Sequence, residues 1–290
     1  MWNEFESPQS VQDALVILEK HGGNARVMGG GTDLLMQLKS KRQTVECLVS
    51  TGKIASMKEI RLEGEKLVIG GAACAMQVQK DPLVRQYVPM LAQACAKLGA
   101  PQIRNAATLA GNVVTAKPAA DSAVALTASD AVLEILGPTP RSIPLIDAYA
   151  GLMQSAVDST KEMVVAIEIP LPTGRYGSHF ARIASRRAAA LPILNAAAAL
   201  CLDDDGNITK SRVVVGGVGP SPQRLYTLED MLQGQRGTID LIEQVCGASP
   251  DHVHPRDSIR SSAAARKGLL PGLLKKCLLS SFEMATKKEG

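Results

Sequence analysis

The stretch RVMGGGTD, residues 26–33, is the most informative part of the sequence for the fold. Its first residues predict the end of a short buried strand, and the apolar residues 34–36 predict a helix after the three glycines. Because glycine has no Cβ, the backbone amides of residues 29–32 can approach an anion closely. A helix N-terminus adds further N–H groups and a partial positive charge. The pattern favours an anion-binding turn, and a surface loop between strand and helix is the alternative.

The composition indicates a globular α/β protein. The chain has 290 residues, of which 46% are hydrophobic and only 3% are aromatic. That length suits roughly two domains, and the aliphatic composition predicts a mixed α/β interior rather than an aromatic-rich β-sandwich. The net charge of +4 is small, and basic and acidic residues are interleaved, which argues against nucleic-acid binding.

Six cysteines are scattered along the chain without a CxxC pair or a Cys/His cluster of metal-ligand spacing. This distribution predicts reduced, mostly buried thiols in a cytoplasmic protein, with no metal site and no iron–sulfur cluster of its own. The first ten residues lack the basic and apolar regions of a signal peptide, and no apolar run is long enough to span a bilayer.

The first half of the chain predicts two α/β blocks. In the first, a helix begins after Ser10, ends at Gly22 or Gly23, and precedes the strand at 26–28, the glycine turn and a strand at 46–49. The second block begins near Lys53. One long helix is expected from Asp81 through Lys97, and prolines mark a boundary after the last strand. The strands predicted in this block are residues 66–70, 131–135 and 162–169.

The composition changes beyond Gly174. A basic cluster (Arg182, Arg186 and Arg187) precedes the run AAALPILNAAAALCL, whose small residues predict close packing against another element. The polar tract 203–207 predicts a hairpin turn, and residues 213–218 predict a return strand. The remainder is expected to be helical, including residues 269–279.

A second motif makes the glycine turn specific. GGGTDLL at residues 29–35 and QIRNAATLAGN at residues 102–112, taken together and in this order, resemble the FAD-binding medium subunit of the molybdenum hydroxylases. This family includes the flavoprotein subunits of xanthine dehydrogenase, carbon monoxide dehydrogenase and nicotinate dehydrogenase. The resemblance covers the full length of the chain. It is supported by IGGAACAMQVQKDPLV (69–84), PAADS (118–122), HFARIASRR (179–187) and DSIRSSAAARKGLL (257–270).

The resemblance implies an α+β protein with an FAD-binding fold of the vanillyl-alcohol-oxidase/PCMH type. Two α/β subdomains, about 1–52 and 53–173, would form an FAD-binding domain over residues 1–173. A C-terminal α/β domain like that of carbon monoxide dehydrogenase flavoprotein would follow over residues 174–290. Non-covalent FAD is expected between these parts, since the sequence carries no mark of covalent flavin attachment.

The site residues are carried over from the family position by position. Residues of the first motif would wrap the pyrophosphate of FAD with backbone amides, and they are Arg26, Val27, Met28, Gly29, Gly30, Gly31, Thr32 and Asp33. A second phosphate-facing loop would consist of Ala107, Thr108, Leu109, Ala110, Gly111 and Asn112. The resemblance places Asp121 where it would hydrogen-bond the adenosine ribose or nearby backbone, Phe180 near the isoalloxazine ring and Arg182 near the polar edge of that ring. Amides from two loops are a sensible means of binding a dianionic pyrophosphate.

Each assignment has a structural alternative, and the sequence departs from the family at one glycine. Asp33 and Asn112 are also typical helix caps or turn-formers. Asp121 could cap a helix that starts at Ser122, and Arg182 could pair with an acid on the surface. Ala110 stands where the family usually has the first glycine of TxGGN, and its methyl group is tolerable if φ is negative there.

The resemblance implies an electron-transfer role within a larger complex. A molybdenum-cofactor large subunit and a [2Fe–2S] small subunit are the expected partners, in a dimer of heterotrimers, with molybdopterin and the iron–sulfur clusters held only by those partners. NAD⁺ or another acceptor would take the electrons from FAD, and no catalytic residue is expected in this chain. The rival functions are a self-sufficient flavin oxidoreductase of the same fold and a non-redox nucleotide-binding assembly protein.

Overall fold

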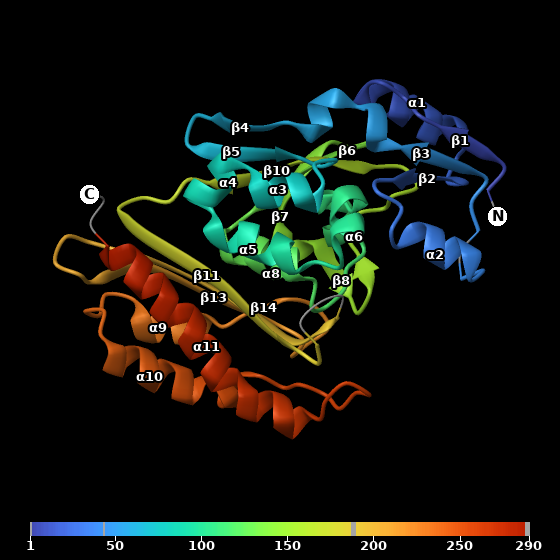
Figure 1. Cartoon of the computed structure of the whole chain (residues 1–290). Helices are drawn as coiled ribbons and strands as arrows, with labels where there is room; N and C mark the ends of the chain where they lie inside the picture. The colour runs from blue at the N-terminus through green and yellow to red at the C-terminus, as the bar shows by residue number, and fades with distance from the viewer. Residues whose placement is uncertain (1, 43, 187–189, 288–290) are drawn as a thin grey trace.

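Sheets and helices alternate in layers in the computed structural model, which describes residues 2–42, 44–186 and 190–287 (Figure 1). A three-stranded sheet at the N-terminal end adjoins a five-stranded sheet, and a layer of helices separates the latter from a four-stranded sheet. Further helices cover the outer face of the four-stranded sheet. Arg187, part of the predicted basic cluster, lies outside the described residues.

The three-stranded sheet is parallel and confirms the predicted β-α-β order. Its strand order is β1-β3-β2, and the helices connect strands that run in the same direction, as parallel pairing requires. Helix α1 begins where predicted, because Ser10 Oγ accepts a hydrogen bond from the amide of Asp13 at 3.0 Å. The elements are β1 (Glu4–Glu6), α1 (Val11–Lys20), β2 (Ala25–Met28), α2 (Leu34–Lys39) and β3 (Cys47–Ser50).

The five-stranded sheet is antiparallel, with the order β4-β5-β10-β6-β7. Its strands are β4 (Ile60–Glu63), β5 (Lys66–Gly70), β6 (Val132–Leu136), β7 (Arg141–Pro144) and β10 (Met163–Pro170). A small hairpin of β8 (Tyr149–Gly151) and β9 (Gln154–Ser155) stands beside it. The helices of this block are α3 (Ala75–Lys80), α4 (Pro82–Tyr87), α5 (Pro89–Lys97), α6 (Pro101–Ala106), α7 (Leu109–Val114) and α8 (Asp121–Ala128).

The prediction of one long helix from Asp81 to Lys97 was wrong. The segment forms two helices, α4 and α5, that are separated at Val88. Pro89 has no N–H, and it disfavours helical geometry in the residue before it. Val88 accordingly adopts φ −139° and ψ 58°, and a new helix begins at the proline.

The C-terminal part is an antiparallel sheet, β11-β12-β13-β14, covered by helices. The prediction that the small-residue run packs closely was right: α8 contacts β12 from one side and α11 from the other. A Cβ on Gly177 would lie 2.0 Å from the carbonyl oxygen of Ser281, and Ser281 Oγ donates to Ala198 O at 3.0 Å. The elements are β11 (Arg175–Ala184), β12 (Pro192–Leu202), β13 (Ile208–Gly216), β14 (Gln223–Arg224), α9 (Tyr226–Leu232), α10 (Ile239–Ala248) and α11 (Ala263–Thr286).

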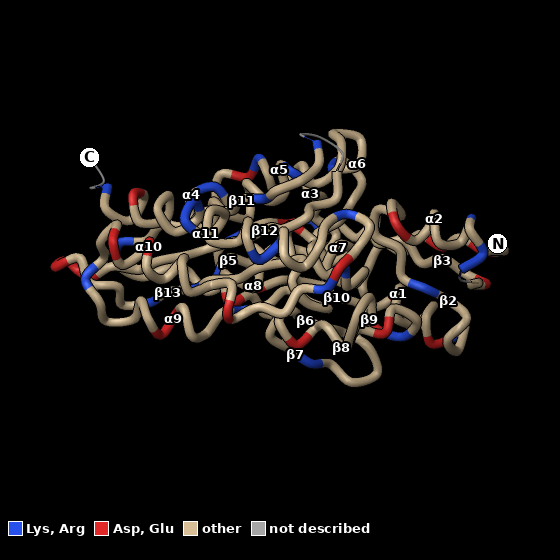
Figure 2. The backbone as a smooth tube through the Cα atoms, turned by 90° about the horizontal axis from the view of Figure 1, so that it is seen from below, with Lys and Arg blue, Asp and Glu red and all other residues tan. Residues whose placement is uncertain are grey.

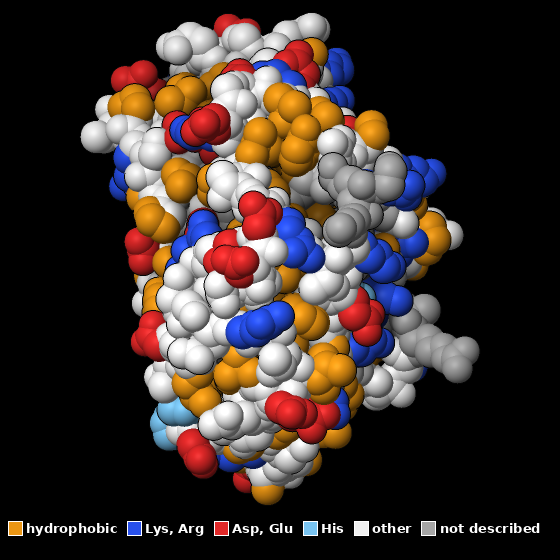
Figure 3. All heavy atoms as spheres, turned by 90° about the vertical axis from the view of Figure 1, so that its left-hand side faces the viewer, with side chains coloured by type: hydrophobic (Ala, Val, Ile, Leu, Met, Phe, Trp, Pro, Cys, Tyr) orange, Lys and Arg blue, Asp and Glu red, His pale blue; other side chains and the backbone are white. Residues whose placement is uncertain are grey.

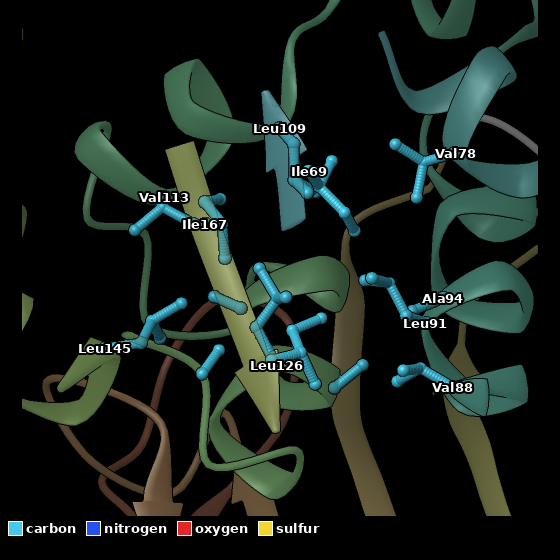
Figure 4. Packing of buried hydrophobic residues seen from close by; sticks show 14 of the residues in the cluster. Ile69, Val78, Val88, Leu91, Ala94, Leu109, Val113, Leu126, Leu145 and Ile167 are labelled. Atoms are coloured by element: carbon cyan, nitrogen blue, oxygen red, sulfur yellow. The ribbon is translucent and has the colours of Figure 1, made fainter. Parts of the chain in front are cut away.

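One aliphatic core joins the five-stranded sheet to the four-stranded sheet through the helices between them. Ile69 and Ile167 of the former meet Leu91 and Leu126 of the helices (Figure 4), and Ala197 of β12 belongs to the same buried cluster. Such continuous burial of aliphatic side chains is the main stabilising contribution expected for this fold.

The surface carries both charge signs throughout. Figure 2 shows the termini at opposite ends of the molecule, with basic and acidic residues interspersed along the chain. The face in Figure 3 likewise mixes apolar, basic and acidic side chains. Among the described residues, none of the helices combines the length and apolar character needed to cross a membrane.

Candidate functional site

The two predicted motifs pack directly against each other. A Cβ on Gly29 would lie 2.3 Å from Thr108 Oγ1, and a Cβ on Gly30 would lie 1.7 Å from the carbonyl oxygen of Ala106. Any side chain at either position would therefore force the turn after β2 away from the loop before α7. The glycines are required first for this contact between the two loops.

The glycine turn leaves its amides open. Among the hydrogen bonds of the described residues, none has the backbone N–H of residues 29–32 as its donor, whereas Leu35 N–H bonds Gly31 O at 3.0 Å. All four residues line a cavity of about 350 Å³. Gly31 is buried, and Gly29, Gly30 and Thr32 are half-buried. Amides that lack a protein acceptor need another partner, and a phosphate group supplies several acceptor oxygens. Helix α2 has only six residues, so the local N–H groups matter here more than a macrodipole.

The second loop differs from its prediction, since most of its amides are already bonded within the protein. Leu109 N–H donates to Ala73 O, Ala110 N–H to Gly71 O, Gly111 N–H to Thr108 Oγ1 and Asn112 N–H to Thr108 O. These bonds cap α7 and hold it onto the segment after β5. The expectation that backbone amides of both loops face a phosphate therefore needs correction. What this loop can offer is the hydroxyl proton of Thr108 and side-chain groups.

Asn112 is placed to be such a group. Its Oδ1 accepts a hydrogen bond from Ser122 Oγ at 2.7 Å, which orients the side-chain amide and leaves the Nδ2 protons to donate. Asn112 is not the N-cap of α7, a position that Thr108 occupies, so the cap alternative fails for this residue. It lines both the first cavity and a second one of about 810 Å³.

The two cavities meet at the glycine turn. Their linings share five residues: Thr32, Asp33, Ala107, Asn112 and Met153. The first cavity extends between the three-stranded and five-stranded sheets, and the second reaches the start of β12 and the loops after β13. Together they form one elongated site that suits a dinucleotide better than a small anion.

Asp33 is held by a lysine rather than used as a helix cap. It occupies the N-cap position of α2, but its side chain makes no capping hydrogen bond. Instead Lys117 Nζ donates to Asp33 Oδ1, so the glycine turn is tied to the chain segment that leaves α7.

Asp121 and Arg182, predicted for opposite ends of the cofactor, form a buried ion pair. Arg182 Nη1 lies 2.7 Å from Asp121 Oδ2, and the two side chains are 7% and 6% exposed. Asn195 Nδ2 donates to Asp121 Oδ1 at 2.8 Å. Burial raises the pKa of the Asp121 carboxyl, and Arg182 and Asn195 oppose that shift. Asp121 therefore neither caps α8 nor stands apart from Arg182, and Arg182 is not a surface residue. Both line the second cavity.

Two predicted residues do not reach either cavity. Phe180 is 4% exposed within the aliphatic core, and its backbone N–H donates to Gln93 Oε1 at 2.8 Å. Phe180 lies on the same face of β11 as Arg182 but deeper under α5, which places it among apolar side chains. Leu109 is 1% exposed in the same core. The structure thus corrects the placement of Phe180 beside a ring and of Leu109 in a phosphate loop.

The remaining residues of the first motif line the first cavity. Arg26, Val27 and Met28 form its wall along β2, and Val27 N–H donates to Ser159 O at 2.9 Å. Burial lowers the pKa of the Arg26 guanidinium, and the charge of Asp158 opposes that shift. Ala107, Ala110 and Gly111 line the same cavity.

Ala110 fits its position. It lies in α7 and is not among the described residues with positive φ, which meets the condition set by its methyl group. A Cβ on Gly71 would lie 3.2 Å from the Ala110 methyl, so that methyl packs closely over the turn after β5.

Some residues that line the two cavities come from distant segments of the chain and were not predicted from the sequence. Ser159 and Glu162 precede β10 and line the first cavity. The second cavity is lined by three arginines, Arg256, Arg260 and the buried Arg266. Arg260 and Arg266 belong to the stretch 257–270 that supports the family resemblance, but that stretch suggested no role for them, and Ser159, Glu162 and Arg256 lie in no such motif.

The family models match both parts of the chain. Residues 3–172 match "FAD binding domain in molybdopterin dehydrogenase", and residues 179–281 match "CO dehydrogenase flavoprotein C-terminal domain". This chain belongs to the FAD-binding subunits of the molybdenum hydroxylase family. It is an oxidoreductase flavoprotein, and its predicted fold class is confirmed.

Individual relatives are similar over nearly their whole length. The nicotinate dehydrogenase FAD-subunit of Eubacterium barkeri is 28% identical over 286 residues, which cover 97% of this chain and 96% of that protein. The putative xanthine dehydrogenase FAD-binding subunit of Escherichia coli (strain K12) is 29% identical over 283 residues, with coverage of 97% and 96%. A structure of carbon monoxide dehydrogenase from Hydrogenophaga pseudoflava matches with a TM-score of 0.90 at 23% identity, covering 98% of both chains.

The residues of this FAD subunit fit the cofactor. The open amides of residues 29–32 suit a pyrophosphate, and the two joined cavities give room on both sides of it. The larger cavity is also the one that reaches the C-terminal part, where Arg182 and Asp121 lie.

Proposed function

We propose that this subunit receives electrons from [2Fe–2S] clusters of a partner subunit and passes them through FAD to NAD⁺ or another acceptor. A molybdenum-cofactor subunit would oxidise the substrate, in a cytoplasmic complex built as a dimer of heterotrimers. The support is the family membership together with relatives named as subunits or medium chains of dehydrogenases.

The observation that carries the proposal is the set of open amides at the junction of the two cavities. In the proposal, the N–H groups of Gly29, Gly30, Gly31 and Thr32 bind the pyrophosphate, and Thr108 Oγ1 and Asn112 Nδ2 add donors from the other side. Donors that are fixed by the fold before the cofactor arrives bind it without a reorganisation cost. Bound FAD supplies the one- and two-electron redox chemistry.

Arg182 would act differently from an isolated cation. A lone guanidinium near the polar edge of the flavin would favour the reduced anionic form strongly. Here the charge of Arg182 is matched by Asp121 at 2.7 Å, so the pair presents a dipole rather than a net charge. We expect the pair to orient the ring and to tune its potential modestly.

The arrangement of the cysteines supports the proposed need for partners. Among the described residues, the one group of His, Cys, Asp and Glu close enough to hold a metal ion contains a single cysteine, whereas an iron–sulfur cluster requires several thiolates. In the proposal, the chain therefore depends on another subunit for its electrons.

The test is purification of the complex from its native host, with analysis of partner chains, flavin, molybdenum and iron. We expect two further subunits with molybdenum and iron, and one FAD per copy of this chain. The isolated chain should bind FAD but should not oxidise purines, aldehydes or N-heterocycles. Flavin reduction by such a substrate in the isolated chain would support a self-sufficient oxidoreductase instead. Reoxidation of the chemically reduced flavin by NAD⁺, a quinone or ferredoxin, compared side by side, identifies the acceptor.

A further inference from the structure

Three side chains of metal-ligand type meet at the edge of the three-stranded sheet. Glu4, His21 and Cys47 bring their carboxylate, imidazole and thiol atoms within 4.8 Å of one another. None of the three lines either cavity of the cofactor site. The cluster is therefore separate from the FAD-binding machinery, and nothing in the proposed electron transfer uses it.

The strand pairing and the position of α1 bring these three side chains together. Glu4 of β1 stands opposite Cys47 of β3 in the parallel register, so their side chains share one face of the sheet. His21 follows α1 directly, and α1 packs over the same face. The residues are far apart in sequence, which is why the spacing of the chain does not predict a metal site.

The separation of two of the three ligand atoms is close to that in a tetrahedral site. His21 Nε2 and Glu4 Oε2 are 3.6 Å apart. In a tetrahedral zinc site with Zn–N and Zn–O bonds of about 2.0 Å and a Zn–S bond of about 2.3 Å, ligand atoms lie roughly 3.3–3.5 Å apart. The backbone on both sides is fixed, since Glu4 N–H donates to Glu46 O at 3.0 Å and His21 N–H donates to Ile17 O at 3.2 Å.

The charges around the thiol favour a cation. The Cys47 thiol is buried, and the carboxylates of Glu4 and Glu6 act on it more strongly than the ammonium group of Lys20. These negative groups favour a divalent ion between them, which the thiol would coordinate as a thiolate.

We propose that Glu4, His21 and Cys47 bind one Zn²⁺ ion, with water as the fourth ligand, and that this ion fastens β1 to β3 and α1. A mixed sulfur, nitrogen and oxygen ligand set is typical of Zn²⁺ and disfavours Mg²⁺ and Ca²⁺, which prefer oxygen ligands. All three residues of β1 are exposed, so this strand has little packing of its own to hold it on the sheet. Glu4, whose side chain is 54% exposed, gives the ion a route to the buried thiol.

The test uses the full-length chain, freed of metal with a chelator and kept reduced without thiols, and titrated with Co²⁺ and then Zn²⁺. We expect one Co²⁺ per chain with a thiolate-to-cobalt charge-transfer absorption in the near ultraviolet, displaced by one equivalent of Zn²⁺. Cys47→Ser and His21→Gln should lose that absorption. Cys246→Ser, which alters a buried thiol in α10, is the matched control and should keep it.

A second measurement covers the case in which Cys47→Ser fails to fold. Glu4→Gln changes only an exposed ligand and should weaken Zn²⁺ binding about 10-fold or more. Zn²⁺ should also slow hydrogen exchange of the β1 amides in the wild type. The proposal is overturned by an absence of Co²⁺ binding, by Co²⁺ binding without the thiolate absorption, or by absorption that survives in the Cys47→Ser variant.

Discussion

The two loops that face the cofactor site look alike in sequence but do different work. Each contains glycine, small residues and a threonine, and they touch each other at Gly29 and Thr108. Within the part of the chain that the structure describes, the first loop has four successive N–H groups without a protein acceptor. The amides of the second loop instead donate to α7 and to the segment after β5. In the proposed function, the first loop binds the pyrophosphate and the second loop supports the first. The glycines of such a motif can therefore be required by packing between loops as much as by the binding of a ligand.

The largest effect is expected from Gly30→Val, which attacks the contact between the loops. Its Cβ would collide with Ala106 O, so the turn must move and its amides with it. Losing two charge-assisted hydrogen bonds of about 1.5 kcal/mol each corresponds to about 100-fold weaker FAD binding. The measurement is flavin content after gel filtration. Gly247→Val, at an exposed position with open space, is the control. Full flavin occupancy in Gly30→Val would show that the turn does not bind the cofactor.

A smaller effect is expected from Asn112→Asp, which converts the donor of the supporting loop into an anion. Ser122 can still donate to the new carboxylate, so the fold should be retained. Replacing a donor to phosphate by a negative charge costs about 2 kcal/mol, or roughly 30-fold in FAD affinity. The loss should shrink as salt is added. Titration calorimetry of the apo chain measures it, with Gly247→Val as the control, and unchanged affinity would remove Asn112 from the site.

Thr108→Val separates the structural role of the supporting loop from its binding role. The variant keeps the shape of the side chain but removes the oxygen that caps α7 at 3.1 Å from Gly111 N. We expect the apo chain to lose about 1 kcal/mol of stability from the missing cap. FAD affinity should fall about 10-fold. Thr32→Val, which keeps the backbone N–H of the binding loop, should leave apo stability unchanged. Equal apo stabilities of the two variants would contradict the division of roles.

The smallest effect on binding is expected from Ala110→Gly, which restores the glycine usual in the family. Because the methyl of Ala110 packs toward Gly71 within α7, it should not obstruct the cofactor. FAD affinity should change by less than about threefold, while helix α7 loses about 1 kcal/mol from the flexible glycine. Affinity and thermal unfolding of the apo chain measure the two effects. A large gain in affinity would mean that the methyl does narrow the approach.

The sequence was informative where the signal is local. The strand, glycine turn and helix over residues 25–39 follow from apolar periodicity and glycine geometry, and Ser10 marks the start of α1 as predicted. Pro89 is a signal for a helix boundary, but the apolar periodicity on both sides of it favoured the prediction of one continuous helix. The alanine run forms strand β12, although alanine has little preference for strands, because close packing between α8 and α11 requires small side chains.

The site was harder to predict from the sequence than the local elements, because tertiary contacts determine which side chains interact. Asp121 and Arg182 lie on α8 and β11, and no pattern along the chain pairs them. The internal hydrogen bonds of the second loop cannot be inferred from QIRNAATLAGN alone. Phe180 shows the limit of a positional analogy, because its side chain lies in the core rather than in either cavity.

In the proposed site, FAD would fill both joined cavities and would contribute to the stability of the fold. Their walls come from all three main sheets, through Met28 in the first, Val164 in the second and Ile193 in the third. A ligand that binds only the folded chain stabilises it by about 2.7 kcal/mol at a free concentration 100 times its Kd. Flavin supply and protein lifetime should therefore be coupled. We expect a cell short of riboflavin to degrade this chain faster, before any effect on turnover by the complex is felt.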